Sequence, residues 1–388
     1  MIVLSLYPND VRVRREAEAL ARSGVAVDVI CLRDDQQAHV EEFGLVTAYR
    51  IIRQRSKESL GSYVMLAGYF TAAAFVKLQT LSLNRRYDVI QAHSMPDFLI
   101  FAGLLHKLLR RRLVLDLHDL SVELFRTKWG GKWPRLMSLV SGIERLSCGF
   151  ADRLITTSQG FQEKLIERRI PEDKITLVLN TPDPNLFPYQ VDRNFDPIAE
   201  GVRLLYHGTV AERFGLETAI EAVALLQRDI PGATLNIFGP YDSNYRVRLE
   251  QQIQNLNVRD FVRLEGSRTL EEIQLIIRRS DIGVAPYWSN EFMDLALSTK
   301  AFEYAASGLP IVASRLKPFT SIFDDQSIRF ARAQDAEDLA QAIVALCRCP
   351  SRRRAQADRA RHALDEISGA VMADRYVNLI KGLINTGA

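Results

Sequence analysis

Short apolar runs of strand length alternate with amphipathic segments twice along this chain of 388 residues, which strongly constrains its fold. Strands that are separated by helices form parallel sheets, because each crossover returns the chain to the same end of the sheet. We therefore predict an α/β protein with two Rossmann-like halves. The predicted strands are 2–6, 25–30, 87–93 and 113–118 in the first half, and 202–206, 234–238, 262–264 and 282–285 in the second.

The domain boundary is predicted from a turn-rich stretch and the polar stretch 191–201 that follows it. We predict an N-terminal, acceptor-side domain over 1–190 and a C-terminal, nucleotide-sugar-binding domain over 201–365. A last helix at about 366–388 is expected to pack back on the first domain. Because ligands of such sheets bind at the carboxyl ends of the strands, we expect the two domains to face each other across a ligand-binding cleft.

Composition excludes several classes of function. The hydrophobic content of 47% and charged content of 25% are typical of a soluble globular protein, and a net charge of +3 does not favour nucleic acid. The four cysteines lack zinc-site spacing and no Asp-x-Asp occurs, so we expect no metal. No signal-peptide pattern opens the chain, and the longest apolar run, 63–76, is shorter than a bilayer-spanning helix. We expect a cytoplasmic protein.

The stretch 298–310 predicts an anion site at the start of a helix. Ser298 and Thr299 are helix-capping residues with free amides behind them, and Lys300 adds a positive charge at the same end. Glu303, one turn further on, is placed to accept hydrogen bonds from a hydroxyl pair such as a ribose. The alternative interpretation is an ordinary capping box in which Glu303 folds back to the cap.

A second loop of the same half follows the strand 202–206. Gly208 and Thr209 precede Arg213, and Gly239 ends the next strand. Gly208 permits a close backbone approach, and Arg213 can neutralise a phosphate through paired hydrogen bonds. The alternative is a helix-entry turn with a solvated arginine. Because two such loops occur in one half, we favour a diphosphate joined to a ribose as the ligand.

Polar residues also follow the strands of the first half. His118 is the catalytic candidate there, and we assign Asp10, Arg12, His93 and Asp119 to the acceptor side. The alternative is that the histidines are structural. The first loop has no Gly-x-Gly-x-x-Gly, which argues against a nicotinamide or flavin cofactor. In the second half, Glu291 and Asp294 are either sugar-binding carboxylates or solvated loop charges.

Basic residues gather in the first half, at 110–112 and 126–135, where tryptophan is interleaved with lysine. An apolar helix is expected over 98–109, beside the arginines. Interfacial membrane segments combine these features, so we predict peripheral contact with the inner face of a membrane. The alternative is a core helix beside solvated charges.

The segments 180–183, 207–216 and 300–310, with the strand-like run 151–158, resemble the retaining GT-B glycosyltransferases of family four over nearly the whole chain. The resemblance implies transfer of a hexose from a nucleotide-sugar with retention, and no cofactor or obligatory metal. It implies that Glu303 binds the donor ribose, that Arg213 and Lys300 bind the phosphates, and that His118 contacts the donor sugar. The family's frequencies favour a UDP-sugar, and UDP-glucose among these.

The sequence departs from the family pattern at three positions. Leu295 stands where the family often has a second glutamate, Thr209 replaces an arginine, and Phe214 replaces a lysine. We expect Arg213 to carry more of the phosphate charge as a result, and Asp294 or Glu291 to contact the sugar.

The acceptor is predicted to be a lipid-linked sugar or a growing polysaccharide of a bacterial cell envelope. Two other functions remain open at this stage. One is a sugar-nucleotide epimerase of the same fold, and the other is a non-catalytic nucleotide-sugar-binding partner in a polysaccharide assembly complex.

Overall fold

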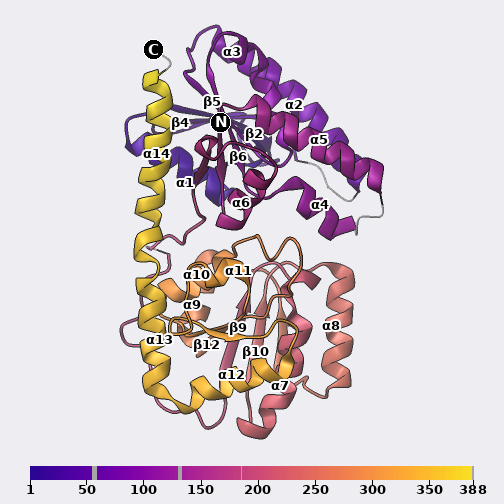
Figure 1. Cartoon of the computed structure of the whole chain (residues 1–388), viewed down its shortest axis with the longest axis vertical. Coiled ribbons are helices and arrows are strands. Elements are labelled where there is room, and N and C mark those ends of the chain that lie inside the picture. Colours follow the sequence, from indigo (N-terminus) through magenta and orange to yellow (C-terminus); the bar gives the residue numbers. More distant parts are fainter. Residues whose placement is uncertain (55–58, 130–132, 185, 387–388) are drawn as a thin grey trace. The chain divides into compact units, whose positions relative to one another are not determined.

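The computed structural model describes residues 1–54, 59–129, 133–184 and 186–386, which form two compact units (Figure 1). Unit 1 contains Met1–Asn180 and Ala370–Ala388, and unit 2 contains Thr181–Gly369. Each unit is built on its own sheet. The predicted α/β class with two parallel-stranded halves is confirmed.

The sheet of unit 1 has the strand order β3-β4-β2-β1-β5-β6-β7-β8, and only β3 runs antiparallel to its neighbour, β4. The second strand starts at Val27, two residues later than predicted, because the amide of Val25 still donates to Leu20 O at the end of the preceding helix (3.0 Å). The strands are β1 (Ile2–Leu6), β2 (Val27–Arg33), β3 (Val40–Phe43), β4 (Val46–Arg53), β5 (Val89–His93), β6 (Arg112–Leu117), β7 (Arg153–Thr156) and β8 (Ile175–Leu177).

The helices of unit 1 include two long ones that the strand pattern did not predict, α2 and α5. The apolar segment expected as one helix over 98–109 is a 3₁₀ helix that continues into a short α-helix. The helices are α1 (Val11–Arg22), α2 (Leu60–Ser82), η1 (Asp97–Gly103), α3 (Leu104–Leu108), α4 (Ser121–Trp129), α5 (Pro134–Phe150), α6 (Gln159–Glu167), η2 (Glu172–Lys174) and α14 (Gly369–Thr386).

The sheet of unit 2 has six parallel strands in the order β11-β10-β9-β12-β13-β14. The strands are β9 (Arg203–His207), β10 (Thr234–Phe238), β11 (Val262–Glu265), β12 (Ile282–Ala285), β13 (Ile311–Ser314) and β14 (Arg329–Ala331). All residues of β12 and β13 are buried, which places the core of the unit along the middle of the sheet.

Helices flank this sheet on both sides (Figure 1). They are η3 (Glu212–Phe214), α7 (Leu216–Asp229), α8 (Ser243–Asn255), α9 (Leu270–Arg279), α10 (Thr299–Ala306), α11 (Lys317–Thr320), α12 (Ala336–Arg348), α13 (Pro350–His362) and η4 (Asp365–Ile367).

The segment between the predicted domains belongs to unit 2. The structure divides the chain after Asn180, whereas the sequence placed the end of the first domain at 190. The buried guanidinium of Arg193 explains the difference, because it donates to the carbonyls of Ser280 (2.6 Å) and Ile277 (3.1 Å). Arg193 therefore fastens this polar stretch to the core of unit 2, although its composition is typical of a linker.

The last helix, α14, is part of unit 1. Tyr376 of this helix is buried, and its hydroxyl donates to the side-chain carbonyl of Gln91 on β5 (2.6 Å). Lys381 donates to the carbonyl of Ser23 at the end of α1 (3.0 Å). These bonds attach the end of the chain to β5 and to the end of α1.

Candidate active site

Lys300 is a buried lysine enclosed by aromatic rings at the start of α10. Its ammonium lies 4.2 Å from the ring centroid of Phe214, 5.3 Å from that of Tyr206 and 5.6 Å from that of Tyr287. Burial, opposed by Glu303 and reinforced by Arg213, lowers the pKa of Lys300 to about 8. Cation–π contacts help to keep such a charge in an apolar setting. Because a second negative group here would offset the cost of burial, the position suits an anionic ligand.

Gly208 makes room for this lysine. Its φ is +107°, and a Cβ at this position would collide with Cε of Lys300. Gly239, with φ of +150°, lies against the carbonyl of Gly208, and a Cβ there would collide with that oxygen. The two predicted loop glycines therefore pack on each other, and the side chain of Lys300 occupies the space that a Cβ of Gly208 would take.

The neighbouring loop carries the second cation of unit 2. The guanidinium of Arg213 lies 4.7 Å from the ring centroid of Phe214, so the same ring contacts both Arg213 and Lys300. Thr209 is exposed, and its carbonyl accepts a hydrogen bond from the hydroxyl of Tyr206 (2.7 Å). The structure therefore brings together Gly208, Thr209, Arg213, Gly239 and Lys300, as the sequence predicted.

Ser298 is the N-cap of α10 but makes no capping hydrogen bond with its side chain. Its hydroxyl instead lies 2.7 Å from the hydroxyl of Tyr287. Thr299 is the first helical residue, and Glu303 lies too far along the helix to form a capping box with Ser298. The alternative interpretation of this stretch as a capping box is therefore wrong.

Glu303 is directed towards the end of β9. One of its carboxylate oxygens lies 3.1 Å from Nε2 of His207, and its side chain is 15% exposed. Burial and the charge of Lys300 lower the pKa of His207 to about 3, so this imidazole is neutral at pH 7. His207 also packs edge-on against Tyr304. A neutral imidazole beside Glu303 leaves the negative charge of the carboxylate in place.

Asp294 lies in the loop before α10, where its two carboxylate oxygens accept from the hydroxyl of Ser289 (2.8 and 3.1 Å). Its own amide donates to the carbonyl of Asn290 (2.9 Å). Asp294 thus takes part in a local turn, and Glu291 in the same loop is exposed.

Asp116, a buried carboxylate on β6, is the centre of a polar cluster in unit 1. Both of its oxygens accept from the guanidinium of Arg12 (2.8 Å each). One of them also lies 3.0 Å from Nδ1 of His93 and 3.1 Å from Nε2 of His118. The cluster therefore links the predicted catalytic histidine to a histidine and an arginine that come from two other elements.

The surroundings of this cluster shift the pKa values of the two histidines in opposite directions. Burial lowers the pKa of His93, and Asp116 only partly opposes this effect. For His118, burial is outweighed by the Asp116 carboxylate, which raises the pKa of the ring above its usual value. The Arg12 guanidinium and His118 hold the pKa of Asp116 well below its usual range in spite of burial. His118, 22% exposed, is the member of the pair that reaches solvent.

Two of the predicted acceptor-side residues have a different position from the one expected. Arg12 is buried and also donates to the carbonyl of Val178 (3.0 Å), and His93 is fully buried. Neither side chain is available to an acceptor substrate, because both are buried and both contact the carboxylate of Asp116. Asp10 caps α1 by accepting from the amide of Val13 (3.2 Å), whereas Asp119, beside His118, is partly exposed.

The ligand-type atoms of His93, Asp116 and His118 lie within 4.8 Å of one another, close enough for a metal site. The bidentate bond from Arg12 to Asp116 argues against this use, because it places a fixed positive charge beside the position that a cation would take. We interpret the cluster as a hydrogen-bonded support for His118.

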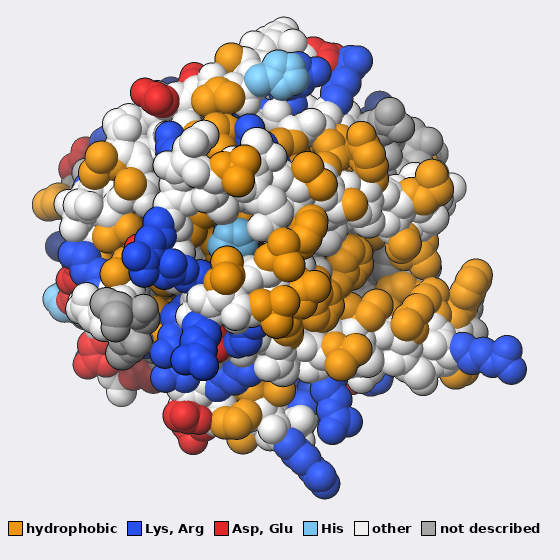
Figure 2. Space-filling model, turned by 90° about the horizontal axis from the view of Figure 1, so that it is seen from above, with side chains coloured by type: hydrophobic (Ala, Val, Ile, Leu, Met, Phe, Trp, Pro, Cys, Tyr) orange, Lys and Arg blue, Asp and Glu red, His pale blue; other side chains and the backbone are white. Residues whose placement is uncertain are grey.

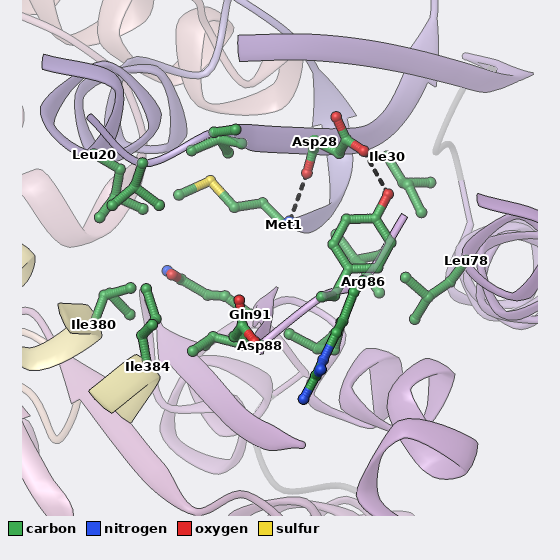
Figure 3. Close-up of a pocket in the computed structure, with 17 residues that line it drawn as sticks. Met1, Leu20, Asp28, Ile30, Leu78, Arg86, Asp88, Gln91, Ile380 and Ile384 are labelled. Atoms are coloured by element: carbon green, nitrogen blue, oxygen red, sulfur yellow. Dashed lines mark hydrogen bonds between the residues drawn. The ribbon is translucent and has the colours of Figure 1, made fainter. Parts of the chain in front are cut away.

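A pocket of about 110 Å³ lies elsewhere in unit 1 (Figure 3). Residues at the amino ends of β1, β2 and β5, including Ile2, Val27 and Val89, line it together with Ile380 of α14. The candidate residues follow the carboxyl ends of strands, so this pocket is at the opposite edge of the sheet. It does not coincide with the predicted site.

Sequence reasoning missed Asp116, His207 and the aromatic residues around Lys300. For Asp116 a signal was present, because it stands two residues before His118 in a strand and side chains at that spacing share a face. The rings of Tyr206 and Tyr287 come from two different strand ends, and no local pattern brings them together.

Comparison with known proteins identifies the family of this chain. Residues 10–186 match Glycosyltransferase Family 4, and residues 201–349 match Glycosyl transferases group 1. A glycogen synthase of Mycobacterium tuberculosis is 27% identical over 312 residues, which cover 78% of this chain and 72% of that protein. The two matches together span most of the chain, which therefore belongs to the glycosyltransferases of the family 4, group 1 type.

Solved structures extend the similarity to the fold. Sucrose-phosphate synthase from Thermosynechococcus elongatus has a TM-score of 0.76 at 21% identity, covering 99% of this chain and 95% of that one. Anabaena HepE in complex with UDP has a TM-score of 0.71 at 17% identity, covering 98% of each chain. The fold is GT-B, as the sequence resemblance implied.

Proposed function

We propose that this glycosyltransferase transfers a hexose from a UDP-sugar, UDP-glucose in the first place, to a lipid-linked or polysaccharide acceptor with retention of configuration. The observation that carries the proposal is the buried Lys300 beside Gly208, with Arg213 in contact with the same ring of Phe214 and Glu303 one turn along α10. UDP is bound by HepE of the same fold, and glycogen synthase, a relative, acts on a polysaccharide by its name.

In the proposed donor site, Lys300 and Arg213 bind the diphosphate, and Glu303 accepts hydrogen bonds from the ribose hydroxyls. Ser298 and Thr299 supply amides near the phosphates, and Gly208, without a Cβ, leaves room beside Lys300. Thr209 and Gly239 lie on the neighbouring loops, and Asp294 is the candidate for a sugar hydroxyl. No cofactor or metal is invoked, because two cations and helix amides are available for the diphosphate charge.

The proposed chemistry is attack of an acceptor hydroxyl on the anomeric carbon from the face that the diphosphate leaves. The new glycosidic bond forms as the bond to the diphosphate oxygen breaks, and that diphosphate takes the proton of the hydroxyl. Lys300 and Arg213 stabilise the negative charge that develops on the leaving group. His118 is proposed to contact the sugar near the reacting carbon, with Asp116 fixing its orientation.

Calorimetric titration with UDP tests the donor site. Glu303→Gln and Lys300→Met are expected to weaken binding at least about tenfold, since each removes a charge-assisted hydrogen bond. The exposed Glu200→Gln and Lys317→Met are matched controls in unit 2 and should bind UDP like the unaltered protein. Unchanged affinity in the first two variants would remove α10 from the donor site.

A turnover assay separates transfer from the two other functions. The protein is incubated with a panel of UDP-sugars, and release of free UDP is followed. A glycosyltransferase releases UDP slowly to water and faster with an acceptor, an epimerase yields a new UDP-sugar, and a binding protein yields neither. Nuclear magnetic resonance of the product's anomeric proton reports retention, and an inverted product would contradict the proposed chemistry.

A further inference from the structure

Helix α2 presents apolar side chains to solvent along its whole length. It has 23 residues, and its most apolar stretch of 18 residues has a mean hydropathy of 1.3 and is only 28% buried. Its length therefore exceeds the short run read from the sequence and is sufficient for a bilayer span. Leu66, Phe70, Ala74 and Leu78 face the core of unit 1, whereas Met65, on the other side, is 76% exposed.

Two neighbouring helices continue this surface. Both α2 and α5 pack against η1, and α3 follows η1 directly (Figure 1). Leu108 and Leu109 of the α3 end are exposed, as are Leu139 and Leu146 of α5. We call the exposed side chains of α2, α3 and α5 the apolar face. Figure 2 shows hydrophobic side chains gathered on one side of the molecule, with Lys and Arg at the margins of the patch.

The unpaired charges on and beside this face are positive, and the nearby Asp88 and Asp152 are paired with Arg111 and Lys107. Arg86, Arg110, Arg135 and Arg145 are exposed, and none of them pairs with a carboxylate among the described residues. From residue 60 to 87, and from 98 to 115, the sequence has no acidic residue, and the one carboxylate of α5, Glu144, is buried. An apolar surface bordered by unpaired cations matches a layer whose surface is anionic and whose interior is hydrocarbon.

We propose that the apolar face docks on an anionic lipid bilayer, with the exposed side of α2 lying in the interface. A second copy of the chain or an acidic protein would also cover apolar groups. The positive charge of the apolar face argues against a second copy, because helices with exposed arginines and no exposed acid repel an identical surface. A bilayer alone accounts for all three features, namely the length of α2, its apolar outer side and the exposed arginines.

Co-sedimentation with vesicles tests the proposal on the full chain. We expect binding to vesicles of phosphatidylglycerol and phosphatidylcholine at low ionic strength, weaker binding to phosphatidylcholine alone, and release as salt is raised. Met65→Glu combined with Leu108→Glu should abolish binding. The matched control is Val247→Glu with Leu275→Glu, which alters two exposed apolar residues of unit 2 and should bind like the unaltered protein.

The charge is tested separately. Replacing Arg110, Arg135 and Arg145 by Gln should weaken binding to the anionic vesicles about a hundredfold, whereas replacing the exposed Arg228, Arg259 and Arg352 of unit 2 should not. A circular dichroism spectrum and a denaturant unfolding transition like those of the unaltered protein show that each variant is folded. The proposal is overturned if the unaltered chain ignores anionic vesicles, if the two sets of variants bind equally, or if the Met65→Glu, Leu108→Glu pair abolishes self-association of a chain that binds no vesicle.

Discussion

At the scale of single residues, Lys300 holds a positive charge where burial opposes it. Burial brings its pKa to about 8, so the ammonium is present at pH 7 and is progressively lost at higher pH. The family resemblance implies a lysine at the position of Phe214, and the ammonium of Lys300 lies closer to that ring than to the other two. A cation therefore lies beside position 214, although it comes from Lys300 of α10 and not from η3.

The affinity for UDP is expected to depend on pH through Lys300. The charged form binds the diphosphate, so affinity should be constant below pH 8 and fall towards tenfold per pH unit above it. Calorimetry between pH 7 and about 9.5 measures this, a range above the titration of the UDP phosphate itself. Lys300→Met should bind more weakly but without the fall. A flat profile for the unaltered protein would exclude Lys300 as the phosphate ligand.

Asp116 controls the charge of His118. Asp116→Asn is expected to lower the pKa of His118, because the carboxylate is what raises it against burial. Nuclear magnetic resonance titration of the imidazole protons measures the change, and the surface variant Asp88→Asn is the control. An unchanged His118 pKa would contradict the proposed support.

The same variant has a signed effect on stability. His118, with its raised pKa, contributes stability that is complete below its unfolded pKa of about 6.5 and lost as pH rises through the folded pKa. Asp116, with its lowered pKa, contributes above about pH 4, and loses this as pH falls through its folded value. Asp116→Asn should therefore cost most between about pH 4 and 6.5, about 1.5–3 kcal/mol, since it removes a charged hydrogen-bond partner of Arg12 while the Glu16 carboxylate, 3.1 Å from the guanidinium, remains. Denaturant unfolding at several pH values checks this.

At the scale of elements, the sequence predicts best where local chemistry decides the structure. Helix α10 and its flanking strands were predicted because the helix-starting residues, Gly308 and the apolar run 311–313 each act locally. The edge strand β3 was missed, because all four of its residues are exposed and only pairing with β4 makes it a strand. Helix α2 was missed because its own apolar residues lie on all of its sides, and the sequence of such a helix has no amphipathic period.

The candidate site follows the same division. Gly208, Arg213, Lys300 and Glu303 were found because helix starts and strand ends mark them in the sequence. Asp116 was not, because its importance depends on three partners that come from β5, from α1 and from the loop after β6. The predicted stretch 126–135 lies partly outside the described residues, which omit 130–132, so its interleaved tryptophan and lysine are not part of this comparison.

The attachment of α14 to the rest of unit 1 can be tested by removing the hydroxyl of Tyr376. Tyr376→Phe removes the donor to Gln91 and leaves that carbonyl buried without this partner, so we expect unfolding of unit 1 to become easier by about 1–3 kcal/mol. Tyr69→Phe, at an exposed position of α2, is the matched control and should have little effect. Equal stabilities of the two variants in denaturant unfolding would show that the bond contributes nothing.

At the scale of the whole molecule, two units of similar construction divide the work unequally in the proposed function. The aromatic-enclosed cation, the loop glycines and Glu303 all belong to unit 2, whereas the histidine cluster and the apolar face belong to unit 1. The chain leaves unit 1 once and returns with α14, so each unit keeps a core of its own. A ligand that binds one unit is therefore expected to stabilise that unit first.

Hydrogen exchange with and without UDP tests this division. A ligand at a hundred times its dissociation constant stabilises the state that binds it by about 2.7 kcal/mol, so amides that exchange by opening of unit 2 should slow by about a hundredfold. The largest protection is expected around Gly208–Arg213 and Ser298–Phe302, where the loop and helix amides face the diphosphate in the proposed site. Lys300→Met at the same UDP concentration should lose most of this protection, and it serves as the control for binding elsewhere. Protection concentrated in the strands of unit 1 would place the nucleotide on the other unit and contradict the proposed donor site, while leaving the vesicle experiment unaffected.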